Sequence, residues 1–208
     1  MENAKLIWDI LEKEGFNDFG KAGVLANIRA ESAMRPNNAQ DSGNRRLNMT
    51  DEAYTAAVDN GTYTNFVRDS IGYGLCQWTY WSRKKALLDF AKQYGRSVGD
   101  LNMQIAYMIR EFRSYGILDK LKTSASVYDA TKCMMLEFEK PANQSEANVR
   151  ARVRHGQGFY EQYAKPSLDT DLKKLVSAGV IKTPEYWKQT APTVKYLPEL
   201  IHNMAAVL

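Results

Sequence analysis

The stretch that decides the fold is FGKAGVLANIRAESAM, residues 19–34. Apolar residues such as Val24 and Ile28 recur in it at helical spacing, and Pro36 stops the pattern, so it predicts a helix. Glu31 lies at the edge of the apolar stripe, where desolvation disfavours a charged carboxylate, as a general acid working near neutral pH requires. The alternative is an ordinary surface glutamate, although the C-terminus of a helix is an unfavourable place for an anion.

A second motif, GYGLCQWT at residues 72–79, follows some forty residues later. Its glycines give the backbone freedom, its rings offer flat faces, and the Gln77 side chain offers an amide. Saccharide grooves use such groups to bind the apolar faces, hydroxyls and N-acetyl amides of sugars. The alternative is a β-hairpin in which Trp78 and Trp81 belong to the core. Gly-x-Gly alone, without a strand before it and a helix after it, does not support a nucleotide site.

The rest of the chain is predicted to be helical nearly throughout, so the fold class is mainly α. Residues 36–71 are rich in Asn, Asp, Gly and Thr and predict a long ordered loop with a short helix at 50–58. Strand signals are few and amount at most to a short hairpin near 61–80. Further helices are expected over 3–14, along the stripe Leu87–Phe90–Ala91–Tyr94, from the Asp100 cap, from Ser126 to Pro141, and over 145–164.

We expect two domains, a main one over residues 1–165 and a small helical module over 168–208, separated by a break at Pro166-Ser167. In the module, one helix should end at Gly179, one should open at Thr183-Pro184, and one should begin near Leu197. About forty residues without a metal or a disulfide rarely fold alone. The module is therefore expected to dock on the main body or to belong to a larger array.

Composition excludes several classes of protein. The net charge is +4, and Lys and Arg are scattered, so nucleic-acid binding is not expected. No segment approaches the roughly 20 apolar residues of a membrane span. The acidic N-terminus is unlike a signal peptide, so we expect synthesis in the cytoplasm, or a domain cut from a longer protein. Cys76 and Cys133 are expected to be independent thiols, although a single disulfide between them is possible. The two histidines lie far apart in the sequence, so no metal site is expected, and no cofactor is expected either.

Four segments together resemble the phage tail-type lysozyme family, the peptidoglycan-cleaving domain on tail tips of phages and prophages of Gram-positive bacteria. They are Asn27–Ser32, Asp69–Thr79, Asp100–Gln104 and Phe138–Ala142. They span roughly residues 1–165, and four matches in order are more specific than any one. The resemblance implies a lysozyme-like domain. The C-terminal module more weakly resembles a small helical module of wall-associated and phage proteins.

The resemblance implies a muramidase that hydrolyses the β-1,4 bond between N-acetylmuramic acid and N-acetylglucosamine. Glu31 would protonate the leaving oxygen as an oxocarbenium ion develops. The enzyme would act on the cell wall as a tail-associated or prophage lysin, with peptidoglycan as substrate, other tail or wall proteins as possible partners, and no cofactor. The residues expected to bind substrate are Ser32, Tyr73, Gly74, Gln77, Trp78, Thr79 and Tyr107.

The sequence alone does not decide which residue is the second carboxylate. We favour Asp69, because it directly precedes the 72–79 turn and lies within a family-like segment. The alternative is that Asp69 only caps this turn through its side chain. The other acidic residues between Glu31 and the turn are Asp41, Asp51, Glu52 and Asp59.

Three other functions are compatible with parts of the sequence. A lytic transglycosylase would use the 6-hydroxyl of the substrate and release a 1,6-anhydro product. A non-catalytic wall-binding module would keep the groove but tolerate any residue at position 31, so the intact Glu31-Ser32 argues against it. A cysteine hydrolase built on Cys76 and His155 lacks a convincing third group to orient the histidine.

Overall fold

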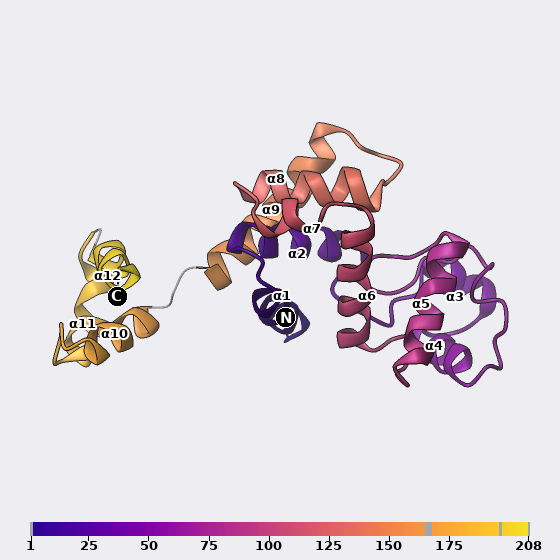
Figure 1. The fold of residues 1–208 in the computed structure, drawn as a ribbon, viewed down its shortest axis with the longest axis horizontal. Coiled ribbons are helices and arrows are strands. Elements are labelled where there is room, and N and C mark those ends of the chain that lie inside the picture. The colour runs from indigo at the N-terminus through magenta and orange to yellow at the C-terminus, as the bar shows by residue number, and fades with distance from the viewer. Residues whose placement is uncertain (1, 165–167, 196, 208) are drawn as a thin grey trace. The chain divides into compact units, whose positions relative to one another are not determined.

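The computed structural model describes residues 2–164, 168–195 and 197–207. The chain divides into two compact units, Met1–Tyr160 and Glu161–Leu208 (Figure 1), which are described separately here. Helices dominate both units, which confirms the predicted mainly-α class. Among the described residues, no helix has the length and apolar character needed to cross a bilayer.

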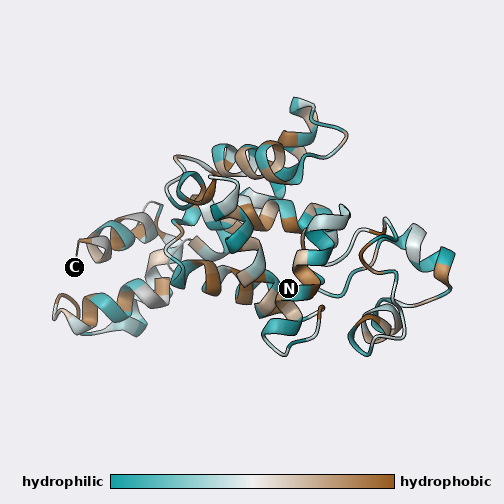
Figure 2. Ribbon diagram, turned by 45° about the vertical axis from the view of Figure 1, so that its right-hand side comes forward, coloured by the Kyte–Doolittle hydropathy of each residue, from teal (hydrophilic) through white to brown (hydrophobic). Residues whose placement is uncertain are grey.

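The first unit is built from nine α-helices and one π-helical segment within its described residues. Figure 2 shows apolar and polar residues alternating along many of these helices, the pattern of helices that bury one face. Their bounds are α1 Glu2–Lys13, α2 Asp18–Ser32, α3 Asp41–Leu47, α4 Asp51–Asp59, α5 Trp81–Gln93, α6 Leu101–Ser114, α7 Leu118–Lys122, α8 Val127–Cys133, η1 Met134–Glu139 and α9 Glu146–Phe159.

Helix α2 is the central helix of this unit and packs against α1, α7, α8, η1 and α9. Small residues allow its close contacts: a Cβ at Gly23 would lie 2.3 Å from the Cβ of Ala130 in α8, and one at Gly156 in α9 would lie 3.1 Å from that of Ala26. The Asn17 side chain caps the first turn, and Ala33 and Met34 adopt left-handed backbone conformations that end the helix. The end of α2, which carries Glu31, is therefore fixed from several sides.

The segment between α2 and α5 is ordered, as predicted. The helix expected at 50–58 is α4, whereas α3 was not predicted. The hairpin suggested near 61–80 is reduced to isolated bridges that pair Tyr73 with Ala39 and with Trp78. Positive φ angles of 74° at Gly74 and 45° at Gln77 turn the backbone too sharply for a longer ladder.

The other predicted helices of the first unit are present, with one addition. Helix α7, of five residues, was not predicted. The helix predicted from Ser126 to Pro141 is α8 continued by η1, and Lys140, with a φ of 51°, ends it one residue before the proline. The helix predicted over 145–164 is α9 continued by the π-helix η2 Tyr160–Ala164, which begins at the unit boundary.

The second unit contains α10 Leu168–Ser177, α11 Pro184–Thr190, a 3₁₀ turn η3 Ala191–Thr193, and α12 Leu197–Ala206. These match the three short helices expected from the sequence. The unit has an apolar core of its own, formed by Leu172, Leu175, Ala191, Ile201 and Ala205. The predicted break at Pro166-Ser167 lies outside the described residues.

Candidate active site

Glu31 lies in the last turn of α2, beside two adjoining surface hollows of about 430 and 480 Å³. Its side chain is 19% exposed, so the carboxylate is shielded and still open to a ligand. Gln40 and Gln77 also line both hollows, and Glu31 lies where the two meet. The hollows therefore form one polar groove that passes the carboxylate.

Arg152 on α9 is the direct partner of Glu31. Its Nη2 donates to Glu31 Oε1 at 2.6 Å, and its Nη1 donates to Asn27 Oδ1 at 2.9 Å. Asn27 is itself held by donating to the carbonyl of Thr131 at 3.1 Å. Asn27, one turn before Glu31 in the first family-like segment, thus orients the arginine that binds Glu31. The sequence pattern pointed to this segment, but Arg152 was not predicted.

Glu139, the last residue of η1, lines the 430 Å³ hollow together with Glu31. Its Oε1 is buried and has no hydrogen-bond partner among the described residues. Burial, and next the negative charge of Glu31, raise the pKa of Glu139 well above its ordinary value. This glutamate lies within the family-like segment Phe138–Ala142, and no role was predicted for it.

Gln77 and Thr79 are the predicted binding residues of the 72–79 turn that face the groove, and both line the 430 Å³ hollow. Gln77 Nε2 donates to the carbonyls of Asn38 at 3.0 Å and Gly74 at 3.2 Å, which fixes the amide. A Cβ at position 72 would lie 2.7 Å from Gln77 Oε1, so glycine there leaves room for this side chain. Ser32 lines the 480 Å³ hollow, although it is buried and its hydroxyl donates back to Ile28.

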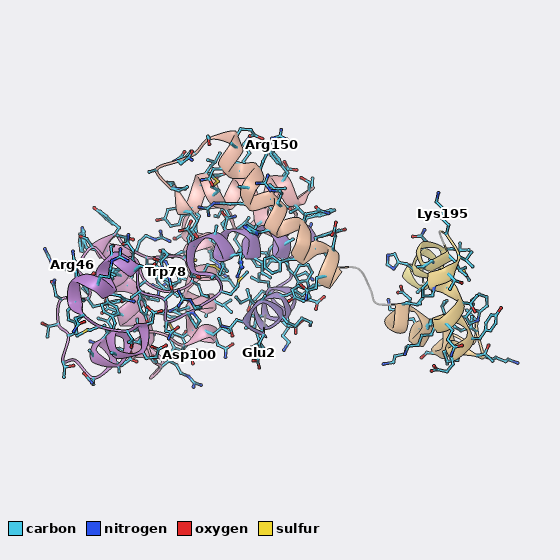
Figure 3. The ribbon with its side chains drawn as sticks, turned by 180° about the vertical axis from the view of Figure 1, so that it is seen from behind. Glu2, Arg46, Trp78, Asp100, Arg150 and Lys195 are labelled. Atoms are coloured by element: carbon cyan, nitrogen blue, oxygen red, sulfur yellow. The ribbon has the colours of Figure 1, made fainter. Side chains whose placement is uncertain are left out.

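Trp78 and Tyr107, also predicted to bind substrate, lie behind the groove wall. Trp78 lies inside the first unit (Figure 3), with no exposed surface, and its Nε1 donates to Glu111 Oε2 at 2.7 Å. The Tyr107 ring contacts the Trp78 ring edge-on, with centroids 5.5 Å apart. Arg83 donates from Nε and Nη2 to the two carboxylate oxygens of Glu111, each at 2.8 Å, and Arg83 lines the 430 Å³ hollow. These rings support the wall from within.

Tyr73 and Gly74 are likewise part of the framework of the turn. Tyr73 is fully buried, and its hydroxyl shares a hydrogen bond of 2.7 Å with Thr55. A Cβ at Gly74 would lie 2.6 Å from Gln104 Oε1, which accepts from the Leu75 N–H at 2.9 Å. Gln104, in the third family-like segment, thus clamps the turn that carries Gln77.

Asp69 lies in a sealed ionic cluster and lines neither hollow of the groove. Lys84 Nζ donates to its Oδ1 at 2.5 Å, and neither side chain of this pair is exposed. Tyr54 donates to its Oδ2 at 2.5 Å, and the Ile71 N–H donates to its Oδ1 at 2.9 Å. Burial lowers the pKa of Lys84, and burial together with the Asp69 hydrogen bond raises that of Tyr54. The structure does not bring Asp69 together with Glu31.

Of the other acidic residues weighed as the second carboxylate, Asp41 lines the 480 Å³ hollow with Glu31 and is exposed. Asp51 accepts from Arg35 at 2.9 Å and from the Ala39 N–H at 3.0 Å. Asp59 caps the loop before α6 by accepting from the Val98 N–H at 2.8 Å. Asp51 and Asp59 therefore have evident structural partners.

Both cysteines are free thiols. Cys76 is buried in the wall of the 430 Å³ hollow, and burial raises the pKa of its thiol well above the ordinary value, which disfavours a nucleophilic thiolate. Burial also raises the pKa of Cys133 to about 11. In the described part of the chain, no group of His, Cys, Asp and Glu side chains has the arrangement of a metal site.

The first unit is thus a helical body with a partly shielded glutamate at the end of α2, beside polar hollows. The family model described as phage tail lysozyme matches residues 2–163, and the chain belongs to this family. No curated protein matches the chain significantly. Membership places the protein among lysozyme-type glycoside hydrolases that act on peptidoglycan.

Proposed function

We propose that the protein is a muramidase, hydrolysing the β-1,4 bond between N-acetylmuramic acid and N-acetylglucosamine, and that it acts as a tail-associated or prophage lysin. The observation that carries the proposal is the position of Glu31, which lines both hollows of the groove. A glycan lying along the groove would pass its scissile bond over this carboxyl group. In this proposal Glu31 acts directly on that bond.

The surroundings of Glu31 support the proposed chemistry. The Arg152 contact of 2.6 Å fixes the direction of the carboxyl group. Gln77 and Thr79 offer an amide oxygen and a hydroxyl in the same wall, groups suited to sugar hydroxyls and N-acetyl amides. We propose these two residues and Ser32 as the substrate-binding residues nearest the cleaved bond.

Mass spectrometry of products from purified peptidoglycan tests the proposal. A muramidase releases fragments that end in a reducing N-acetylmuramic acid. A lytic transglycosylase, the second candidate, instead releases 1,6-anhydro ends, because the 6-hydroxyl of the substrate replaces water. The burial of Asp69 favours this second candidate, because the residue expected to be the second carboxylate does not line the groove.

The decisive variant is Glu31→Gln. Its matched control is Glu137→Gln, because Glu137 is 44% exposed and pairs with Lys120 on the surface. We expect the control to cleave like the wild type and Glu31→Gln to release no fragments while still binding walls. Wall binding by the wild-type protein without released fragments would instead favour a non-catalytic wall-binding module.

A further inference from the structure

Glu139 reaches the groove from a different part of the chain than Glu31. Glu31 ends α2, whereas Glu139 ends η1, where Lys140 takes a left-handed conformation before Pro141. Both carboxyl groups line the same 430 Å³ hollow. A ligand in that hollow therefore meets two carboxyl groups from two different elements.

The charged groups around Glu139 leave it without a dedicated counter-ion. The charges of Glu31 on α2, Arg83 on α5 and Arg152 on α9 act on it, and the Cys76 thiol of the 72–79 turn forms a hydrogen bond with its side chain. Arg83 directs a two-fold hydrogen bond to Glu111. Arg152 directs its Nη1 and Nη2 to Asn27 and Glu31. The hydrogen bonds of both arginines named here thus go to Glu111, Asn27 and Glu31 rather than to Glu139.

A purely structural carboxyl group would be expected to satisfy its buried oxygen. Glu139 Oε1 is buried and has no hydrogen-bond partner among the described residues, which is unfavourable for folding. The negative charge of Glu31 at the same hollow adds to burial in raising the pKa of Glu139. A ligand that binds to both Glu31 and Glu139 in the 430 Å³ hollow would explain why Glu139 Oε1 has no partner among the described residues.

We propose that Glu139 is the second catalytic carboxyl group, forming with Glu31 a pair that donates a proton to the glycosidic oxygen and takes one back from water. This inference rests on the proposed glycoside hydrolysis. The proton of the pair moves to the bridging oxygen while the bond from C1 to that oxygen breaks, and the bonding electrons stay with the oxygen. The pair, now doubly negative, faces the positive sugar ring. Water then adds to C1, and the pair takes up the proton that this water loses, which restores its starting state.

The test is Glu139→Gln, because glutamine has the shape of a protonated glutamate but cannot give up a proton. We expect kcat on peptidoglycan near pH 7 to fall by about 10²-fold or more, which is typical of a lost proton-transfer group. KM and wall binding should stay near the wild-type values, and the variant should be at least as stable as the wild-type protein, because no buried carboxyl group has to ionise. The remaining activity should rise toward acidic pH, where solvent supplies the proton. Glu137→Gln, in the same π-helical segment, is the matched control and should keep the wild-type rate and pH profile.

A structural role for Glu139 makes the opposite prediction. If Glu139→Gln keeps the wild-type kcat and pH profile while Glu31→Gln is inactive, the inference is overturned and the proposed function stands. If the wild-type protein cleaves no glycosidic bond, the proposed function itself fails.

A second measurement does not depend on the folding of the Glu139 variant. Carbon-13 NMR of glutamate carboxyl groups in the wild-type protein should show Glu139 titrating well above an ordinary glutamate. In Glu31→Gln this titration should move to lower pH, because the neighbouring negative charge is gone. An ordinary titration of Glu139 that is unchanged by the Glu31 substitution would overturn the pairing of the two carboxyl groups.

Discussion

Two carboxylates of the first unit each bind a basic side chain, and their surroundings differ sharply. Glu31 and Arg152 keep 19% and 8% of their side chains exposed and lie beside the groove. Asp69 and Lys84 keep none, and Tyr54 and the Ile71 N–H complete a closed set of hydrogen bonds. The first pair is open to a ligand, and buried polar atoms beside it, such as Glu139 Oε1, have no hydrogen-bond partner among the described residues. The second pair is closed to solvent, and the hydrogen bonds of its carboxylate are complete.

A carboxylate that lies close to a motif in the sequence is therefore not necessarily a group that reacts with substrate. A buried ion pair contributes little net stability, but removing one partner is strongly destabilising. The Asp69 cluster ties the segment before the 72–79 turn to α5, through Lys84. We therefore expect substitutions at Glu31 to affect chemistry and substitutions at Asp69 to affect folding.

The largest effect is expected for Glu31→Gln. Turnover should fall by about 10²–10⁴-fold, because the groove loses a carboxyl group that acts on the glycosidic bond. The melting temperature should change little, since glutamine can still accept a hydrogen bond from Arg152. Clearance of wall suspensions and calorimetry measure the two quantities. Near wild-type clearance would remove Glu31 from the mechanism.

Asp69→Asn is expected to act on stability. The substitution leaves Lys84 buried without its carboxylate, which costs about 3–5 kcal/mol in comparable cases. Denaturant unfolding measures this, and the double variant with Lys84→Met should recover part of the loss. Turnover per folded molecule should be retained. A variant of normal stability that has lost turnover would instead favour the sequence prediction of Asp69 as the second carboxylate.

The sequence predicted the helical class and the position of Glu31 because both rest on local patterns. Hydrophobic periodicity needs several turns to be visible, so α3, with seven residues, and α7, with five, were missed. The aromatic residues of the turn were harder to assign. The alternative that placed Trp78 in the core agrees with its burial, whereas Trp81 is 47% exposed.

The partners of Glu31 were missed for a different reason. Arg152 follows it by 121 residues, and only the packing of α9 against α2 brings the two together. Glu139 was visible within a family-like segment, but its desolvation depends on elements that meet only in the fold. Asn27 was the available signal, since a buried amide one turn before Glu31 must bind something.

The raised pKa of Glu139 predicts that the stability of the protein depends on pH. The folded state holds the Glu139 proton more tightly than the unfolded state, whose pKa is near 4.5. This stabilisation is complete below that value and is lost as the pH rises through the folded-state pKa. The wild-type protein should therefore lose stability relative to Glu139→Gln over that range, by about 1.4 kcal/mol for each unit of pKa difference. Parallel stability curves would show that Glu139 titrates normally.

The variants Gln77→Ala and Trp78→Phe compare a residue on the surface of the groove wall with a residue buried behind it. Gln77 lines both hollows, so its loss should weaken binding of chitin-type oligosaccharides by about 1 kcal/mol and leave the melting temperature nearly unchanged. Trp78→Phe removes the donor to Glu111 and leaves a gap, so it should lower the melting temperature with a smaller effect on binding. Isothermal titration and calorimetry measure both. Unchanged affinity in Gln77→Ala would count against its place in the substrate site.

The smallest effect on cleavage is expected from removing the second unit. The family match ends at residue 163, and the residues of the groove all lie in the first unit. The second unit buries its own apolar cluster, including Leu172 and Ile201, so its loss need not expose the core of the first. A chain ending after Tyr163 should therefore cleave soluble peptidoglycan fragments at the wild-type rate, while binding to intact walls or assembly into larger particles is reduced. A folded protein of that length without activity would show that the second unit helps to build the site.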